Sequence, residues 1–109
     1  MHELAITEGL VDAVTQRLPG KRVTRIRLEI GALSGVVADS VLFCFDLVTE
    51  GTDLEGATLE IAQPPALCSC RVCGSQFEPD CPIAICPCGS PEVTVLAGQD
   101  LKITSVQVA

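Results

Sequence analysis

Six of the seven cysteines of this 109-residue chain lie in one short stretch, between Cys68 and Cys88. Within it, Cys70 and Cys73 form a CxxCG turn, and a shorter CPCG turn begins at Cys86, thirteen residues after the first turn's second cysteine. Two paired-thiol turns in this order are the signature of a zinc ribbon, in which four thiolates hold one Zn²⁺. We therefore predict a structural four-cysteine zinc site with no open position for catalysis.

The zinc ligands could be chosen in more than one way, because Cys68 and Cys81 offer two further thiols. We favour the cysteines of the two turns, since each pair closes on a glycine that lets backbone N–H groups approach sulfur. These predicted ligands are Cys70, Cys73, Cys86 and Cys88. Iron also suits four thiolates, so a rubredoxin-like electron carrier is an alternative interpretation. The seventh cysteine, Cys44, is expected to be a small hydrophobic residue of the core.

The only histidine of the chain is its second residue, within the sequence Met-His-Glu. The amine of Met1, the amide nitrogen of His2 and the imidazole Nδ1 of His2 can chelate one ion through fused rings. Glu3 can supply a fourth ligand through its amide or its carboxylate. Nitrogen-rich tetragonal sites favour Ni(II) or Cu(II), whereas zinc does not prefer square geometry. A locked sulfur site beside an open nitrogen site is typical of a carrier that keeps one metal and delivers another.

The hydrophobic pattern predicts the elements that position these residues. Apolar residues at helical spacing predict a helix from Leu4 to Leu18. Alternation around residues 25–30 predicts a half-buried strand, and a second helix is expected to follow, with Asp39 as its N-cap and Gly51 at its end. Residues 57–63, 93–96 and 100–108 are strand-like.

This order predicts an α+β fold, a small three-stranded sheet with two helices plus an inserted zinc-ribbon module. We expect residues 1–65 and 94–109 to form a nickel-binding α+β domain, and residues 66–93 to form the ribbon. No run of about 18 apolar residues is present, so no membrane span is expected. The start of the chain lacks the features of a signal peptide, which favours a cytoplasmic location.

The charge balance bears on the choice of function. The formal net charge is −7, and the aromatic residues are three phenylalanines without Tyr or Trp. This composition opposes nucleic-acid binding, which depends on cationic contacts to phosphate and on aromatic stacking. A zinc-ribbon module for protein or nucleic-acid interaction, with no nickel role, is therefore the weaker alternative. We expect no enzyme, because the ribbon thiols are needed for metal and Cys44 lies in an apolar helix face.

The chain resembles the HypA/HybF family of hydrogenase nickel-insertion proteins. The resemblance begins with MHE at residues 1–3 and continues through RVTRIRLEIGALSGV and LFCFDLVTEGT. It closes with CxxCG, CPCGS and GQDLKITSVQV, so it covers essentially the whole chain.

The resemblance implies an α+β nickel domain with an inserted zinc ribbon, and a protein that delivers Ni²⁺ to the large subunit of nickel–iron hydrogenases. It further implies a HypB-type GTPase as partner and, in some organisms, a supply of nickel for urease maturation. By position, His2 is the nickel ligand, with Met1 and Glu3 beside it, and the cysteines of the two turns are the zinc ligands. The chain departs from the family at CPC, where much of the family has CPxC, so the fourth zinc ligand could differ.

Overall fold

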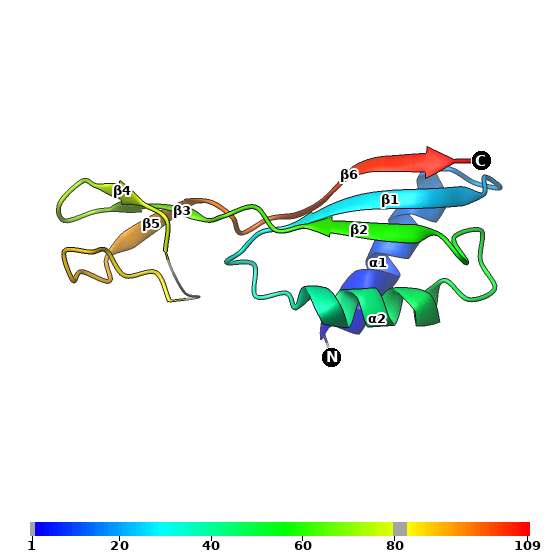
Figure 1. Cartoon of the computed structure of the whole chain (residues 1–109), viewed down its shortest axis with the longest axis horizontal. Helices are drawn as coiled ribbons and strands as arrows, with labels where there is room; N and C mark the ends of the chain where they lie inside the picture. Colours follow the sequence, from blue (N-terminus) through cyan, green and yellow to red (C-terminus); the bar gives the residue numbers. More distant parts are fainter. Residues whose placement is uncertain (1, 80–82) are drawn as a thin grey trace. The chain divides into compact units, whose positions relative to one another are not determined.

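The computed structural model describes residues 2–79 and 83–109 of the chain (Figure 1). In these ranges the elements are α1 (His2–Arg17), β1 (Val23–Ile30), α2 (Ala38–Val48), β2 (Thr58–Ala62), β3 (Leu67–Cys70), β4 (Gln76–Phe77), β5 (Val93–Ala97) and β6 (Leu101–Val108). The predicted α+β class is confirmed. The chain divides into two compact units. Unit 1 comprises Met1–Leu28, Val36–Ile61 and Ile103–Ala109, and unit 2 comprises Glu29–Gly35 and Ala62–Lys102.

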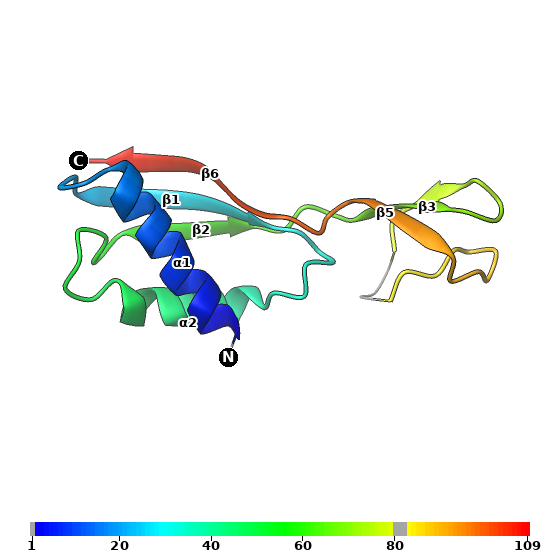
Figure 2. The same ribbon diagram turned by 180° about the vertical axis from the view of Figure 1, so that it is seen from behind.

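Unit 1 holds both helices and most of a three-stranded sheet of order β2-β1-β6. In both views α1 lies across this sheet, and α2 lies next to α1 (Figures 1 and 2). The central strand β1 alternates as the sequence predicts, with Ile26 and Leu28 buried and Arg27 exposed between them. The large buried apolar side chains of unit 1 are Leu10, Val11, Val14, Val23, Ile26, Leu28, Val41, Phe45 and Leu54. They form an aliphatic core with one aromatic ring.

Unit 2 contains a second three-stranded sheet, of order β4-β3-β5, and has little apolar core. Strand β3 pairs antiparallel with both neighbours, and Cys68 lies opposite Phe77 on one side and Val95 on the other. Among the described residues, the largest fully buried side chains are nine in number. Only two of them, Ile30 and Cys68, belong to unit 2. Hydrophobic burial alone therefore stabilises unit 2 weakly.

Within unit 2 three chain segments meet at Gly31, Ala66 and Gly98. The N–H of Gly31 donates to Asp100 O at 2.8 Å, and the N–H of Leu33 donates to Gly98 O at 2.7 Å. A Cβ on Gly31 would lie 2.2 Å from Gly98 O, and one on Gly98 would lie 2.5 Å from Ala66 Cα. Both glycines are therefore required by close backbone approach. This junction explains why the segment after β1 belongs to unit 2.

Two details of α2 differ from the predictions. Asp39 is not the N-cap, because the helix begins at Ala38 and the N-cap is Val37, whose side chain makes no capping hydrogen bond. Asp39 instead lies in the first turn, where a carboxylate is favoured by the helix dipole. Cys44 is half-buried rather than part of the core, and it lines a surface groove beside Phe43.

The observed units also differ in extent from the domains expected from sequence. Unit 2 contains the whole predicted ribbon, residues 66–93, and adds residues 29–35, 62–65 and 94–102. The assignment of nickel to one domain and zinc to the other stays a prediction at this point. Among the helices that the described residues form, none is long and apolar enough to cross a membrane.

Candidate metal centres

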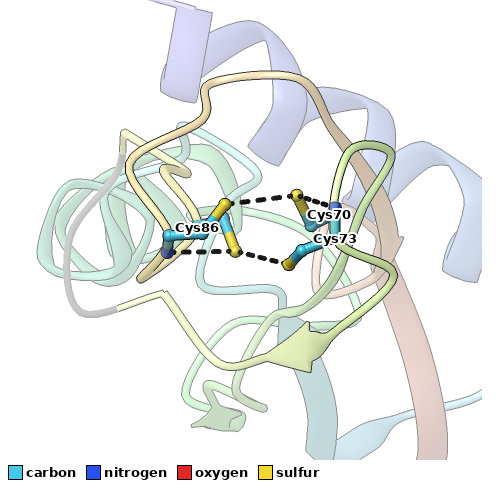
Figure 3. Close-up of side chains that lie close together, drawn as sticks. Cys70, Cys73 and Cys86 are labelled. Carbon is cyan, nitrogen blue, oxygen red and sulfur yellow. Dashed lines mark hydrogen bonds between the residues drawn. The ribbon is translucent and has the colours of Figure 1, made fainter.

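Four cysteine thiols of unit 2 face one another across two turns of the chain (Figure 3). The Sγ atoms of Cys70, Cys73, Cys86 and Cys88 all lie within 4.8 Å of one another. Sγ of Cys70 is 3.8 Å from that of Cys88, and Sγ of Cys73 is 3.5 Å from that of Cys86. With Zn–S bonds of about 2.3 Å, the edges of a regular tetrahedron measure about 3.8 Å. The cluster therefore has the donor atoms and the size that a four-thiolate zinc site needs.

The first turn shapes the sulfur environment of Cys70. Backbone N–H groups of Val72 and Cys73 each donate to Cys70 Sγ at 3.4 Å. The turn is closed by two further bonds, from Gly74 N–H to Cys70 O at 3.1 Å and from Cys70 N–H to Ser75 O at 2.8 Å. Gly74 has a φ of +79°, which explains why the turn ends on glycine.

The second turn accommodates the shortened CPC spacing by using a tighter version of the same closure. Gly89 N–H donates to Cys86 O at 2.7 Å, which leaves Pro87 at the second position of a four-residue turn, where proline is favoured. Cys86 N–H donates to Ser90 O at 2.9 Å, and Cys88 N–H donates to Cys86 Sγ at 3.5 Å. One residue fewer thus still brings two thiols to the cluster.

The polar surroundings divide negative charge unevenly among the thiols. Hydrogen bonds from the hydroxyl and the backbone N–H of Ser75 lower the pKa of Cys73 to about 6. The N–H groups of Cys73 and Val72 hold the pKa of Cys70 below its ordinary value. The N–H of Cys88 lowers the pKa of Cys86, but burial and the neighbouring thiols together raise it to about 12. Without metal, the cluster therefore holds both thiolate and thiol at neutral pH.

Zinc affinity is expected to fall as the pH falls, because protons compete with metal for the thiolates. Cys86 must release a proton on binding zinc at any pH below about 12, whereas Cys73 must do so only below about 6. A plot of log Kd against pH should therefore steepen by about one proton per zinc below pH 6. Competition with a chelator between about pH 5 and pH 8 measures this slope.

Ser75→Ala is the matched control for that slope, since it removes the hydroxyl that stabilises the Cys73 thiolate. The variant should move the steepening to higher pH and leave the number of bound zinc ions unchanged. A zinc affinity that does not depend on pH would contradict this account of the cluster.

Cys68 and Cys81 are the two thiols that the sequence left as alternative zinc ligands. Cys68 is fully buried in β3, and its sulfur is not in the four-thiol group. Cys81 lies outside the described residues.

At the other candidate site, α1 begins at His2, whose side chain is 62% exposed. The imidazole Nε2 of His2 lies 2.9 Å from Oε2 of Glu3. The side chain of Glu3 is only 9% exposed, although it belongs to the first turn of a surface helix. The pair therefore places an open imidazole against a buried carboxylate.

The carboxylate of Glu3 also contacts α2. The backbone N–H of Val37, the N-cap of that helix, donates to Glu3 Oε2 at 3.3 Å. This hydrogen bond is the main reason that the pKa of Glu3 lies below its ordinary value. The same oxygen thus contacts the imidazole of His2 and the first turn of a second helix.

Sequence reasoning did not anticipate Val37 and Ser75. The bond from Val37 to Glu3 joins residues 34 positions apart, and no local pattern indicates it. Ser75 had a visible signal, because both cysteine turns end in Cys-Gly-Ser. In each turn the serine carbonyl accepts the N–H of the first cysteine.

The fold and the four-cysteine cluster together place the chain in the class of small α+β proteins with a zinc-ribbon type of metal site. The family model described as hydrogenase/urease nickel incorporation, metallochaperone, HypA matches residues 1–108. A hydrogenase maturation factor HypA from Nostoc punctiforme is 46% identical over 99% of this chain and 96% of its own length. The corresponding protein of Geotalea uraniireducens is 44% identical over 99% of both chains.

The fold has relatives among solved structures. The solution structure of the nickel metallochaperone HypA from Helicobacter pylori aligns with a TM-score of 0.65 and 18% identity, over 97% of this chain and 96% of that one. At this identity the likeness concerns the fold alone. The family model and the sequence relatives complete the identification: the chain belongs to the HypA family of nickel-incorporation metallochaperones for hydrogenase maturation.

Proposed function

We propose that the chain binds one Ni(II) at its N-terminus and delivers it to the large subunit of a nickel–iron hydrogenase. The nickel ligands are the amine of Met1, the amide nitrogen of His2 and its imidazole Nδ1, with Glu3 beside them. Zn(II) is held separately by Cys70, Cys73, Cys86 and Cys88 and has a structural role. Unit 1 is then the nickel domain, and unit 2 contains the zinc ribbon.

The main support for a nickel site at the N-terminus is the position of His2 at the start of α1. The first N–H groups of a helix have no acceptor within that helix, so the amide of His2 can lose its proton without breaking the helical ladder. Its imidazole is exposed and its Nε2 contacts Glu3, which leaves Nδ1 for the ring that includes its own amide nitrogen. An open site built from one terminus suits reversible binding, which delivery requires.

The chemistry of the two centres supports a division of roles. Four thiolates in a closed tetrahedron leave no position for exchange, so the ribbon keeps its metal. Nitrogen donors in a tetragonal arrangement favour nickel over zinc. Delivery is binding and release rather than catalysis, so we propose that the chain is not an enzyme. We further propose that it acts in the cytoplasm with a HypB-type GTPase, and that it can serve urease maturation proteins.

The proposal predicts the outcome of a maturation assay. A bacterial strain that makes a nickel–iron hydrogenase but lacks its own HypA-family protein should regain hydrogenase activity when this chain is expressed. His2→Ala should fail to restore it, although the variant should accumulate to the same level with one zinc per chain. Equal hydrogenase activity with both proteins would contradict delivery from residues 1–3.

A further inference from the structure

The carboxylate of Glu3 is held by the backbone of a different helix. Val37 cannot cap α2 with its own side chain, and its N–H donates to Glu3 Oε2 at 3.3 Å. In a capping box, a carboxylate three residues into the helix normally bonds the N-cap N–H. Here α2 has Ser40 at that position, and Glu3 of α1 takes the role instead. The start of α2 therefore fixes where this carboxylate lies.

The fixed carboxylate determines which nitrogen of His2 carries the proton. A neutral imidazole has one N–H donor and one lone pair, and a carboxylate only accepts hydrogen bonds. Because Nε2 lies 2.9 Å from Glu3 Oε2, Nε2 is the donor and Nδ1 holds the lone pair. Nδ1 is the nitrogen that can close a chelate ring with the amide of His2. Imidazole ligands of metals commonly donate their second nitrogen to such an outer acceptor.

We propose that Glu3 is a positioning residue, which the N-terminus of α2 holds in place and which turns the lone pair of His2 toward nickel. In this arrangement the carboxylate is an outer partner of the imidazole and not the fourth nickel ligand. The inference rests on the proposed function, since it assumes that His2 binds nickel. It adds that the backbone N–H of Val37, 34 residues away, contributes to nickel affinity.

Val37 offers a test that leaves both His2 and Glu3 unchanged. Val37→Pro deletes the N–H that holds Glu3, and the native φ of −88° is close to what proline adopts. Val37→Ala keeps the N–H and is the matched control, at a residue that is 55% exposed. In zinc-loaded protein that begins at Met1, we expect Val37→Pro to weaken nickel binding about 10-fold. Val37→Ala should bind nickel as the unmodified chain does.

A second variant tests the role of the carboxylate directly and decides the question if Val37→Pro does not fold. Glu3→Gln keeps an oxygen that can accept from Nε2 but removes the charge. If Glu3 only positions His2, the absorption bands of bound Ni(II) should stay the same while the affinity falls. In the metal-free protein at about pH 8, the ¹⁵N shifts of the His2 ring should show one tautomer in the unmodified chain. Glu3→Ala should show exchange between two.

Two results would overturn the inference. One is equal nickel affinity for Val37→Pro and Val37→Ala in folded protein, and the other is a change in the nickel absorption bands of Glu3→Gln that indicates a lost ligand. Either result would leave the proposed function intact if His2→Ala still abolished binding. If His2→Ala bound nickel normally, the proposed function itself would fail.

Discussion

Replacing Cys86 with serine is expected to release zinc and to unfold unit 2, while α1 and α2 keep their structure. Cys86 is only 3% exposed, and its Sγ lies 3.5 Å from that of Cys73 and accepts the backbone N–H of Cys88. Structural zinc contributes apparent binding energies of about 10–16 kcal/mol in small domains. The described residues of unit 2 bury few large apolar side chains, so hydrophobic burial does not replace this energy. Native mass spectrometry reports the zinc, and amide NMR spectra report which unit loses order.

Cys68→Ala is the control for that experiment. Cys68 is fully buried in β3 of the same unit, but its thiol lies outside the four-sulfur group. We expect this variant to keep one zinc per chain and the dispersed NMR signals of unit 2. If Cys68→Ala released zinc as Cys86→Ser does, the ligand set would be wrong. Retention of zinc by Cys86→Ser at unchanged affinity would contradict it equally.

Adding four residues before Met1 is expected to weaken nickel binding by at least about 100-fold, or about 2.7 kcal/mol. The extension converts the amine of Met1 into an amide and places the new terminal amine too far along the chain to close fused rings with the amide and imidazole of His2. His2, Glu3 and all four thiols of the cluster stay unchanged. Isothermal titration calorimetry with Ni(II), on zinc-loaded protein, gives the affinity.

The control for the extension is the same four residues added after Ala109, which change the chain length without affecting the amine. This protein should bind nickel as the unmodified chain does, and both proteins should contain one zinc. A nickel affinity that survives the N-terminal extension would show that the amine is not a ligand, whatever the role of His2.

The cysteine cluster was predictable because its geometry is local. Each turn is closed by hydrogen bonds between residues at most five positions apart, as from Cys70 to Ser75. Two such turns need only face each other to bring four sulfurs together. The strand β1 was equally predictable from the sequence, since the alternation of apolar and polar residues around Ile26 and Leu28 is a local pattern.

The surroundings of Glu3 were not predictable because they depend on a contact between distant residues. The sequence marks Asp39 as a plausible cap, and only the packing of α1 against α2 brings Glu3 to the N–H of Val37. A carboxylate supplied by another helix leaves no pattern near the helix that it caps. The same limitation applies to Gly31, whose close approach to Gly98 places the segment after β1 in unit 2.

The buried face of α2 is hard to predict from sequence, because the helix is apolar on several sides. Val41 and Phe45 are buried, but Leu42 is 40% exposed and Phe43 is 70% exposed. Periodicity identifies a buried face when polar residues mark the opposite one, and here Asp46 does so only weakly. The helix itself was predictable, whereas its orientation required the tertiary structure.

The most direct measurement of the central claim is a calorimetric nickel titration of zinc-loaded protein that begins at Met1, compared with His2→Ala. We predict one tight nickel site in the unmodified chain and its loss in the variant, with the zinc content of both proteins equal. Equal nickel binding by the two proteins would contradict the claim that residues 1–3 carry the metal to be delivered.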